Sequence, residues 1–149
     1  MKEAVYFFVS IPTSSPSFFM SCPTSPKCIA KLCLRVGFGG ALALVGVAHY
    51  MDLAGFTGMV SGGLGPLSGL GTLYAYVLPG LEIVGGVLIV AGQKHDVAAW
   101  CAGVALASIA VGMLLKPVLG GVGLGEVMPA ANNTLLWLLV YVMVVKCCM

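Results

Sequence analysis

The sequence predicts an all-α integral membrane protein, built as a four-helix bundle. Hydrophobic residues make up 60% of the 149 positions and charged residues only 8%, whereas a soluble domain carries roughly 25% charged residues. Seven basic and five acidic side chains cannot cover the surface of a soluble fold of this size, so lipid must solvate most of it. The apolar residues fall into four stretches near the length of roughly 20 residues that crosses a bilayer.

Residues 1–28 are predicted to form an irregular tail. The apolar stretch 4–11 is too short to span a membrane, and four prolines follow among serines and threonines up to Pro26, a composition typical of extended chain. Two alternatives stay open: a weak signal-peptide start without a clear cleavage site, and translation from Met20.

The four-helix domain is predicted over residues 29–149, and its first span covers about 29–51. The interior of this span is rich in glycine and alanine, which allow close helix–helix approach. The glycine-rich segment 53–71 follows, with apolar residues spaced like one face of a short helix. We expect an interfacial or re-entrant segment there, because exposed irregular backbone is not tolerated in the lipid core.

The remaining spans are predicted at about 72–92, 97–115 and 130–146. A short polar turn, 93–96, separates the second span from the third, and the third ends at Lys116. Asn132, Asn133 and Thr134 are candidate N-cap residues for the last span.

The basic residues predict that both termini are cytoplasmic. With a cytoplasmic N-terminus, the outer side receives only Lys116, and the positive-inside rule favours that orientation. The cytoplasmic side then receives Lys2, Lys27, Lys31, Arg35, Lys94 and Lys146.

Glu82 is the most informative polar residue because it lies near the middle of the second span. An ionised carboxylate in hydrocarbon costs at least about 2.5 kcal/mol, so Glu82 must face the bundle interior, pair with a cation or be protonated. Arg35 is a candidate partner, since the two residues differ in depth by under ~10 Å at 1.5 Å per residue. The alternative is that Arg35 extends to the lipid headgroups without meeting Glu82.

His49 and Lys116 lie at similar depth near the outer ends of their spans. His49 is expected to anchor the interface, and its functional alternative is a proton-accepting or quinone-contacting residue. No haem is expected, because His49 and His95 lie on opposite membrane faces and no other histidine exists.

The six cysteines are expected to be free thiols, and no metal site is predicted. Cys22 and Cys28 are separated by five residues, outside the two to four that separate the ligands of a zinc site. Cys147 and Cys148 follow a helix end and are candidates for palmitoylation. The net charge of +2, without a basic run, predicts that nucleic acid is not a partner.

Two stretches of the chain resemble the DoxX family of membrane proteins. The first span opens with Arg35-Val36-Gly37-Phe38 and ends with Gly46-Val47-Ala48-His49-Tyr50. The second contains Leu78-Pro79-Gly80-Leu81-Glu82-Ile83-Val84-Gly85-Gly86-Val87-Leu88-Ile89-Val90-Ala91-Gly92. The resemblance covers about residues 29–146 and implies a four-helix membrane fold in which Glu82 matches a buried glutamate.

The resemblance also implies a function, which is expected to be that of a subunit in a redox or quinone-linked membrane complex. Thiosulfate or thiol oxidation, or protection against oxidative stress, would be its role. Quinone is then the candidate cofactor, and a membrane or peripheral redox protein is the expected partner. The alternatives are a non-catalytic membrane scaffold and, less favoured, a small transporter or proton pathway with Glu82 as the carrier. A homo-oligomer is compatible with each of them.

Overall fold

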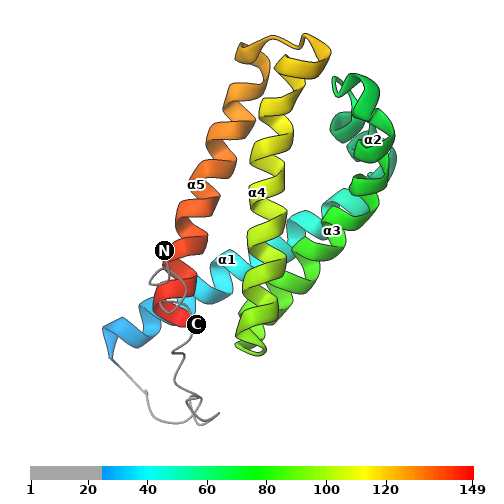
Figure 1. Cartoon of the computed structure of the whole chain (residues 1–149). Helices are drawn as coiled ribbons and strands as arrows, with labels where there is room; N and C mark the ends of the chain where they lie inside the picture. Colours follow the sequence, from blue (N-terminus) through cyan, green and yellow to red (C-terminus); the bar gives the residue numbers. More distant parts are fainter. Residues whose placement is uncertain (1–24) are drawn as a thin grey trace, which may run out of the picture.

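The computed structural model describes residues 25–149, and this part of the chain is helical throughout apart from its turns. The prediction of an all-α bundle is confirmed: four of its helices are long and apolar enough to cross a membrane. Figure 1 shows these four with the short helix α2 at one end of the bundle. The elements are α1 (Pro26–Met51), α2 (Leu53–Ser61), the short 3-10 helix η2 (Gly65–Leu67), α3 (Ser68–Ala91), α4 (His95–Gly120) and α5 (Leu124–Cys148).

Helix α1 begins at Pro26, inside the segment predicted to be an irregular tail. Proline suits the first helical position, because its fixed φ matches the helix and its missing N–H needs no partner there. The prediction for residues 26–28 was therefore wrong, and the prediction for residues 1–24 lies outside the described residues.

Helix α3 is the centre of the bundle, and its glycines bring both neighbouring helices close. A Cβ atom on Gly86 would lie 2.6 Å from the backbone nitrogen of Ala43 in α1, and one on Gly85 would lie 2.8 Å from that of Ala102 in α4. Neither glycine therefore has room for a side chain. Small residues at such crossings let the backbones themselves make contact, which is how helices associate where lipid supplies no hydrophobic driving force.

Helices α1 and α3 run antiparallel in a register set by two contacts. Gly39 of α1 lies against the carbonyl oxygen of Gly86, and Gly46 lies against that of Pro79. From Gly39 to Gly46 the chain advances seven residues along α1, and from Gly86 to Pro79 it goes back seven residues along α3. Both pairs repeat after about two helical turns, so they lie on one face of each helix.

Helix α2 and η2 form the segment predicted to be interfacial. Asp52 begins α2 by accepting a hydrogen bond from the backbone N–H of Gly55 at 3.2 Å. Phe56 turns inward and is buried, together with Ala75 and Leu78 of α3. The segment therefore packs against the bundle through Phe56.

Helices α4 and α5 lie side by side and close the bundle (Figure 1). Phe38 of α1 reaches them, with its ring centroid 5.7 Å from that of Trp137 in α5. Helix α5 begins at Leu124, so the expected N-cap at residues 132–134 was wrong. Inside the helix the Thr134 hydroxyl donates to the carbonyl oxygen of Ala130 at 2.8 Å, which satisfies its polar group without a cap.

Lys116 holds α2 against α4. Its side chain is buried, and the Nζ atom donates a hydrogen bond to the backbone carbonyl oxygen of Met59, near the C-terminal end of α2. A cation is favoured there, because the last carbonyls of a helix lack intrahelical partners. Lys116 therefore anchors α2 across the bundle.

Replacing Lys116 by methionine is expected to loosen α2 while keeping a side chain of similar length. A hydrogen bond from a charged donor contributes about 1.5–3 kcal/mol. Amide hydrogen exchange in residues 53–61 should accelerate at least about tenfold, the factor that corresponds to 1.4 kcal/mol. Lys94→Met, at an exposed position in the α3–α4 turn, is the matched control and should leave that exchange unchanged. Equal exchange rates in both variants would contradict the anchoring role.

Candidate functional site

The most distinctive polar contact within residues 25–149 joins His49 of α1 to Glu82 of α3. The Nδ1 atom of His49 lies 2.8 Å from Oε2 of Glu82. The glutamate is 1% exposed, and the histidine side chain is 23% exposed. The carboxylate therefore lies inside the bundle, as the cost of placing it in lipid predicts, while the imidazole connects it to the bundle surface.

The glycine contacts of α1 and α3 explain why these two residues meet. His49 follows Gly46 by three residues, and Glu82 follows Pro79 by three residues. Residues three apart share a helix face. The close contact of Gly46 with the Pro79 carbonyl and the Glu82 Cβ therefore brings the imidazole within hydrogen-bonding distance of the carboxylate.

Phe56 of α2 covers the imidazole. Its ring is stacked on that of His49, with the centroids 3.9 Å apart and an angle of 13° between the planes. Beside this stack, the Tyr50 hydroxyl donates to the carbonyl oxygen of Tyr76 at 2.9 Å and makes a second link between α1 and α3. Three helices thus fix the imidazole orientation, and we call His49, Glu82 and Phe56 the His–Glu site.

The His–Glu site can hold a proton in two arrangements. It is either an imidazolium–carboxylate ion pair or a neutral imidazole with a protonated carboxyl group, and both keep the hydrogen bond. Moving one proton along this bond interconverts the two arrangements. The pair stays neutral overall during this transfer, so no buried charge is left unpaired while the proton moves between Glu82 and the imidazole.

The other predicted site residues, Arg35 and Lys116, do not join the His–Glu site. The guanidinium of Arg35 lies against Gly92, which ends α3 in a left-handed conformation with φ 65°. Gly92 is ten residues from Glu82, or about 15 Å along the helix at 1.5 Å per residue. Lys116 contacts α2 instead. The proposed Arg35–Glu82 pair is therefore replaced by His49–Glu82.

Two contributors to this region were not predicted from the sequence. Phe56 lies in the segment 53–71, whose apolar residues were predicted to form one face of a short helix, yet it stacks on the imidazole. Tyr74 of α3, one turn from Leu78, hydrogen-bonds to Ser108 of α4 and joins these helices on the other side of α3. Neither contact follows from helical spacing. His49 and Phe56 lie on either side of the turn at Asp52, and Tyr74 and Ser108 lie on two helices, 34 positions apart.

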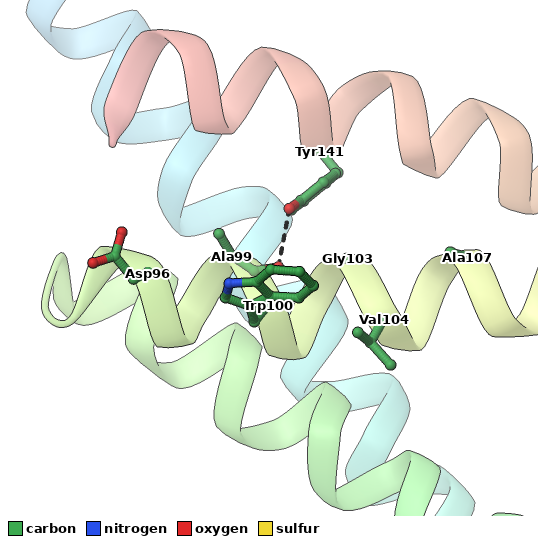
Figure 2. A pocket seen from close by; sticks show the side chains of 7 residues that line it. All are labelled: Asp96, Ala99, Trp100, Gly103, Val104, Ala107 and Tyr141. Atoms are coloured by element: carbon green, nitrogen blue, oxygen red, sulfur yellow. Dashed lines mark hydrogen bonds between the residues drawn. The ribbon is translucent and has the colours of Figure 1, made fainter. Parts of the chain in front are cut away.

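A separate groove of about 360 Å³ lies between α4 and α5. Figure 2 shows that it follows α4 from Asp96 to Ala107, with Tyr141 of α5 on its other side. The Tyr141 hydroxyl is already bonded to the carbonyl oxygen of Ala99 at 2.9 Å. Trp100 at its edge is 74% exposed, as expected of an aromatic residue at a membrane–water interface. The groove shares no lining residue with the His–Glu site.

Comparison with known families decides the classification of the chain. The family model of the methylamine utilisation protein MauE matches residues 27–125, from the start of α1 to the start of α5. The chain is a member of the MauE family. The predicted DoxX membership was therefore wrong, and the thiosulfate oxidation that it implied is no longer supported. No curated protein and no solved structure matches the chain.

Membership of the MauE family and the four apolar helices together make this chain an integral membrane protein. The matched region contains both His49 and Glu82, and also all of α2. The His–Glu site therefore belongs to the MauE-like part of the chain. Most of α5 lies beyond the match.

Proposed function

We propose that this chain is the membrane component of a redox pathway, in which the His–Glu site exchanges protons with a two-electron carrier of the quinone class. The observation that carries the proposal is a buried carboxylate bonded to a partly exposed imidazole. The name of the MauE family supports the redox link, since the methyl carbon of methylamine is at the oxidation level of an alcohol and must be oxidised further to yield energy.

The residues of the His–Glu site fit the headgroup of a quinone. A quinone, when bound, takes up or releases two electrons and two protons. The exposed edge of the His49 imidazole supplies a hydrogen bond donor or acceptor at the bundle surface, and Phe56 holds the ring in place. Glu82 then stores or supplies the proton behind the imidazole.

The proposal places the His–Glu site on the outer side of the membrane, with both termini cytoplasmic. Arg35 lies against the end of α3, and the start of α1, the α3–α4 turn and the end of α5 are at the end of the bundle away from His49. The positive-inside rule assigns this basic end to the cytoplasm. A membrane or peripheral redox protein is the partner that would accept or donate the electrons.

Glu82→Gln is expected to abolish the infrared band of a carboxyl group that changes its protonation when the quinone is reduced. The protein in lipid nanodiscs would be loaded with a short-chain ubiquinone, and reduced-minus-oxidised infrared spectra recorded. The wild-type chain should show a carboxyl C=O band that Glu82→Gln removes, and quinone affinity should fall about tenfold, as for loss of one charge-assisted hydrogen bond.

Glu126→Gln is the matched control, since Glu126 is an exposed carboxylate at the same end of the bundle. Its spectrum and quinone affinity should equal those of the wild-type chain. A wild-type protein that binds no quinone, or a Glu82→Gln spectrum identical to the wild-type spectrum, would overturn the proposal.

A further inference from the structure

The end of the bundle away from the His–Glu site carries an adjacent pair of thiols. Cys147 and Cys148 are the last two residues of α5, and both are free. Cys147 is exposed and Cys148 is partly buried. Not every cysteine is a thiol, however, because Cys28 is disulfide-bonded, and the expectation that all six are free was wrong for this residue.

Cys148 is held against the start of α1. Its Sγ atom donates to the carbonyl oxygen of Lys31 at 3.4 Å, across 117 positions of the sequence. This contact fixes one of the two sulfur atoms and leaves the other, on Cys147, accessible to solvent. The pair therefore combines an open thiol with a positioned one.

Two lysines lie beside the pair. Lys31 supplies the backbone carbonyl oxygen that Cys148 contacts, and Lys146 directly precedes Cys147. The thiolate is the nucleophilic form of cysteine, and an attacking thiolate must be accessible to its substrate. The two lysines attract anionic molecules and repel cationic ones, an effect that salt screens within a Debye length of about 10 Å at 0.1 M.

The geometry of a helix end lets this pair close into a disulfide. Adjacent side chains on an α-helix point about 100° apart, whereas a disulfide needs Cβ atoms about 3.5–4.5 Å apart. The bond can therefore form only when the last turn unwinds. The last four carbonyls of α5 lack intrahelical partners, so unwinding there breaks few hydrogen bonds. A strained, exposed disulfide of this kind is readily reduced.

We propose that Cys147 and Cys148 form a dithiol–disulfide couple that exchanges with the disulfide of an anionic peptide. The Cys147 thiolate attacks the substrate disulfide, whose S–S bond breaks, and one substrate thiolate leaves and takes up a proton. Cys148 then attacks the Cys147 sulfur, releasing the second substrate thiol. Two electrons and two protons pass to the substrate, and cellular thiols of the glutathione class regenerate the dithiol by the reverse steps.

Oxidised glutathione, an anionic disulfide, is the probe for this couple. The full chain in nanodiscs, with Cys147 and Cys148 as thiols and the Cys28 disulfide intact, would be mixed with it and the products identified by mass spectrometry. The wild-type chain should lose two thiols and form an internal Cys147–Cys148 bond without retaining glutathione. Cys148→Ser should retain glutathione on Cys147, because the resolving sulfur is missing, and Cys147→Ser should react about tenfold more slowly.

Matched controls come from the other free cysteines and from the probe's charge. Cys33→Ser and Cys101→Ser should react as the wild-type chain does. Cystamine, a cationic disulfide, should react more slowly than oxidised glutathione at low salt, and the difference should shrink at high salt. Glu82→Gln should leave the exchange unchanged, which separates this couple from the proposed function of the His–Glu site.

Three results would contradict the proposed Cys147–Cys148 dithiol–disulfide couple. One is a wild-type chain that keeps stable glutathione adducts without an internal bond. Another is a Cys148→Ser chain that carries no adduct on Cys147. The third is fatty-acid thioesters on both cysteines of the chain purified from native membranes, which would assign the pair to lipid anchoring instead.

Discussion

Replacing Gly86 by alanine is expected to destabilise the bundle more than replacing any other glycine of α1 or α3 by alanine. The added Cβ would lie 2.6 Å from the backbone nitrogen of Ala43 and 2.9 Å from its Cβ atom. Backbone atoms cannot move aside by rotating a side chain, so α1 and α3 must separate. Overpacking of this kind costs about 1–3 kcal/mol and occasionally more.

The separation should also reach the His–Glu site, because Gly46 and Pro79 belong to the same interface. The Gly86→Ala chain should therefore unfold at lower temperature in nanodiscs, and NMR should show its His49 ring in more than one environment, where the wild-type ring should show a single one. Gly86→Leu should have a larger effect in the same direction.

Gly40→Ala is the matched control for Gly86→Ala. Gly40 lies on α1 next to the interface glycine Gly39, but a Cβ on Gly40 would meet no atom within 4 Å. Alanine is a better helix former than glycine, so stability should stay equal or rise by up to about 1 kcal/mol. If Gly40→Ala and Gly86→Ala shifted the unfolding temperature equally, the effect would come from helix propensity and not from the α1–α3 contact.

The membrane fold could be predicted from composition because so few charged residues are present. The position of Glu82 could be predicted for the same physical reason, since lipid tolerates a carboxylate poorly. The structure agrees: the side chain is 1% exposed. Both inferences depend on a large energetic penalty, which constrains the fold whatever the details of packing.

The partner of Glu82 could not be predicted in the same way. Depth in the membrane alone allowed Arg35 as the partner of Glu82. A depth estimated from span boundaries is uncertain by several residues, or several ångströms. The choice of His49 depends on how α1 is rotated and shifted against α3. A signal was present in the sequence: Gly46 precedes His49 by three residues, as Pro79 precedes Glu82. Only the contact between Gly46 and Pro79 shows that the two spacings belong to one interface.

The family assignment failed for a related reason. The stretches that resembled DoxX proteins are made largely of glycine and aliphatic residues around one glutamate. Close packing of membrane helices favours such a composition in any bundle. The match to the MauE family extends over residues 27–125, well beyond those two stretches. Short apolar stretches thus indicate the architecture, while the family needs agreement along several helices.

Replacing His49 by alanine is expected to cost about 3 kcal/mol of folding free energy, because it leaves the Glu82 carboxylate buried without its partner. Removal of one member of a buried ion pair costs about 3–5 kcal/mol. The lower end applies here, since the His49 side chain is 23% exposed and water can enter part of its space. Reversible unfolding in mixed detergent micelles, followed by circular dichroism, would measure the change.

A second substitution separates the effect of the buried charge from the lost stacking on Phe56. In the double variant His49→Ala/Glu82→Gln the buried group is a neutral amide, whose burial costs less than that of a carboxylate. At least half of the lost stability should return. His95→Ala, at the exposed first residue of α4, is the control and should change stability by less than about 0.5 kcal/mol. A double variant no more stable than His49→Ala would instead assign the loss to the stacked rings, and the carboxylate would not need the imidazole.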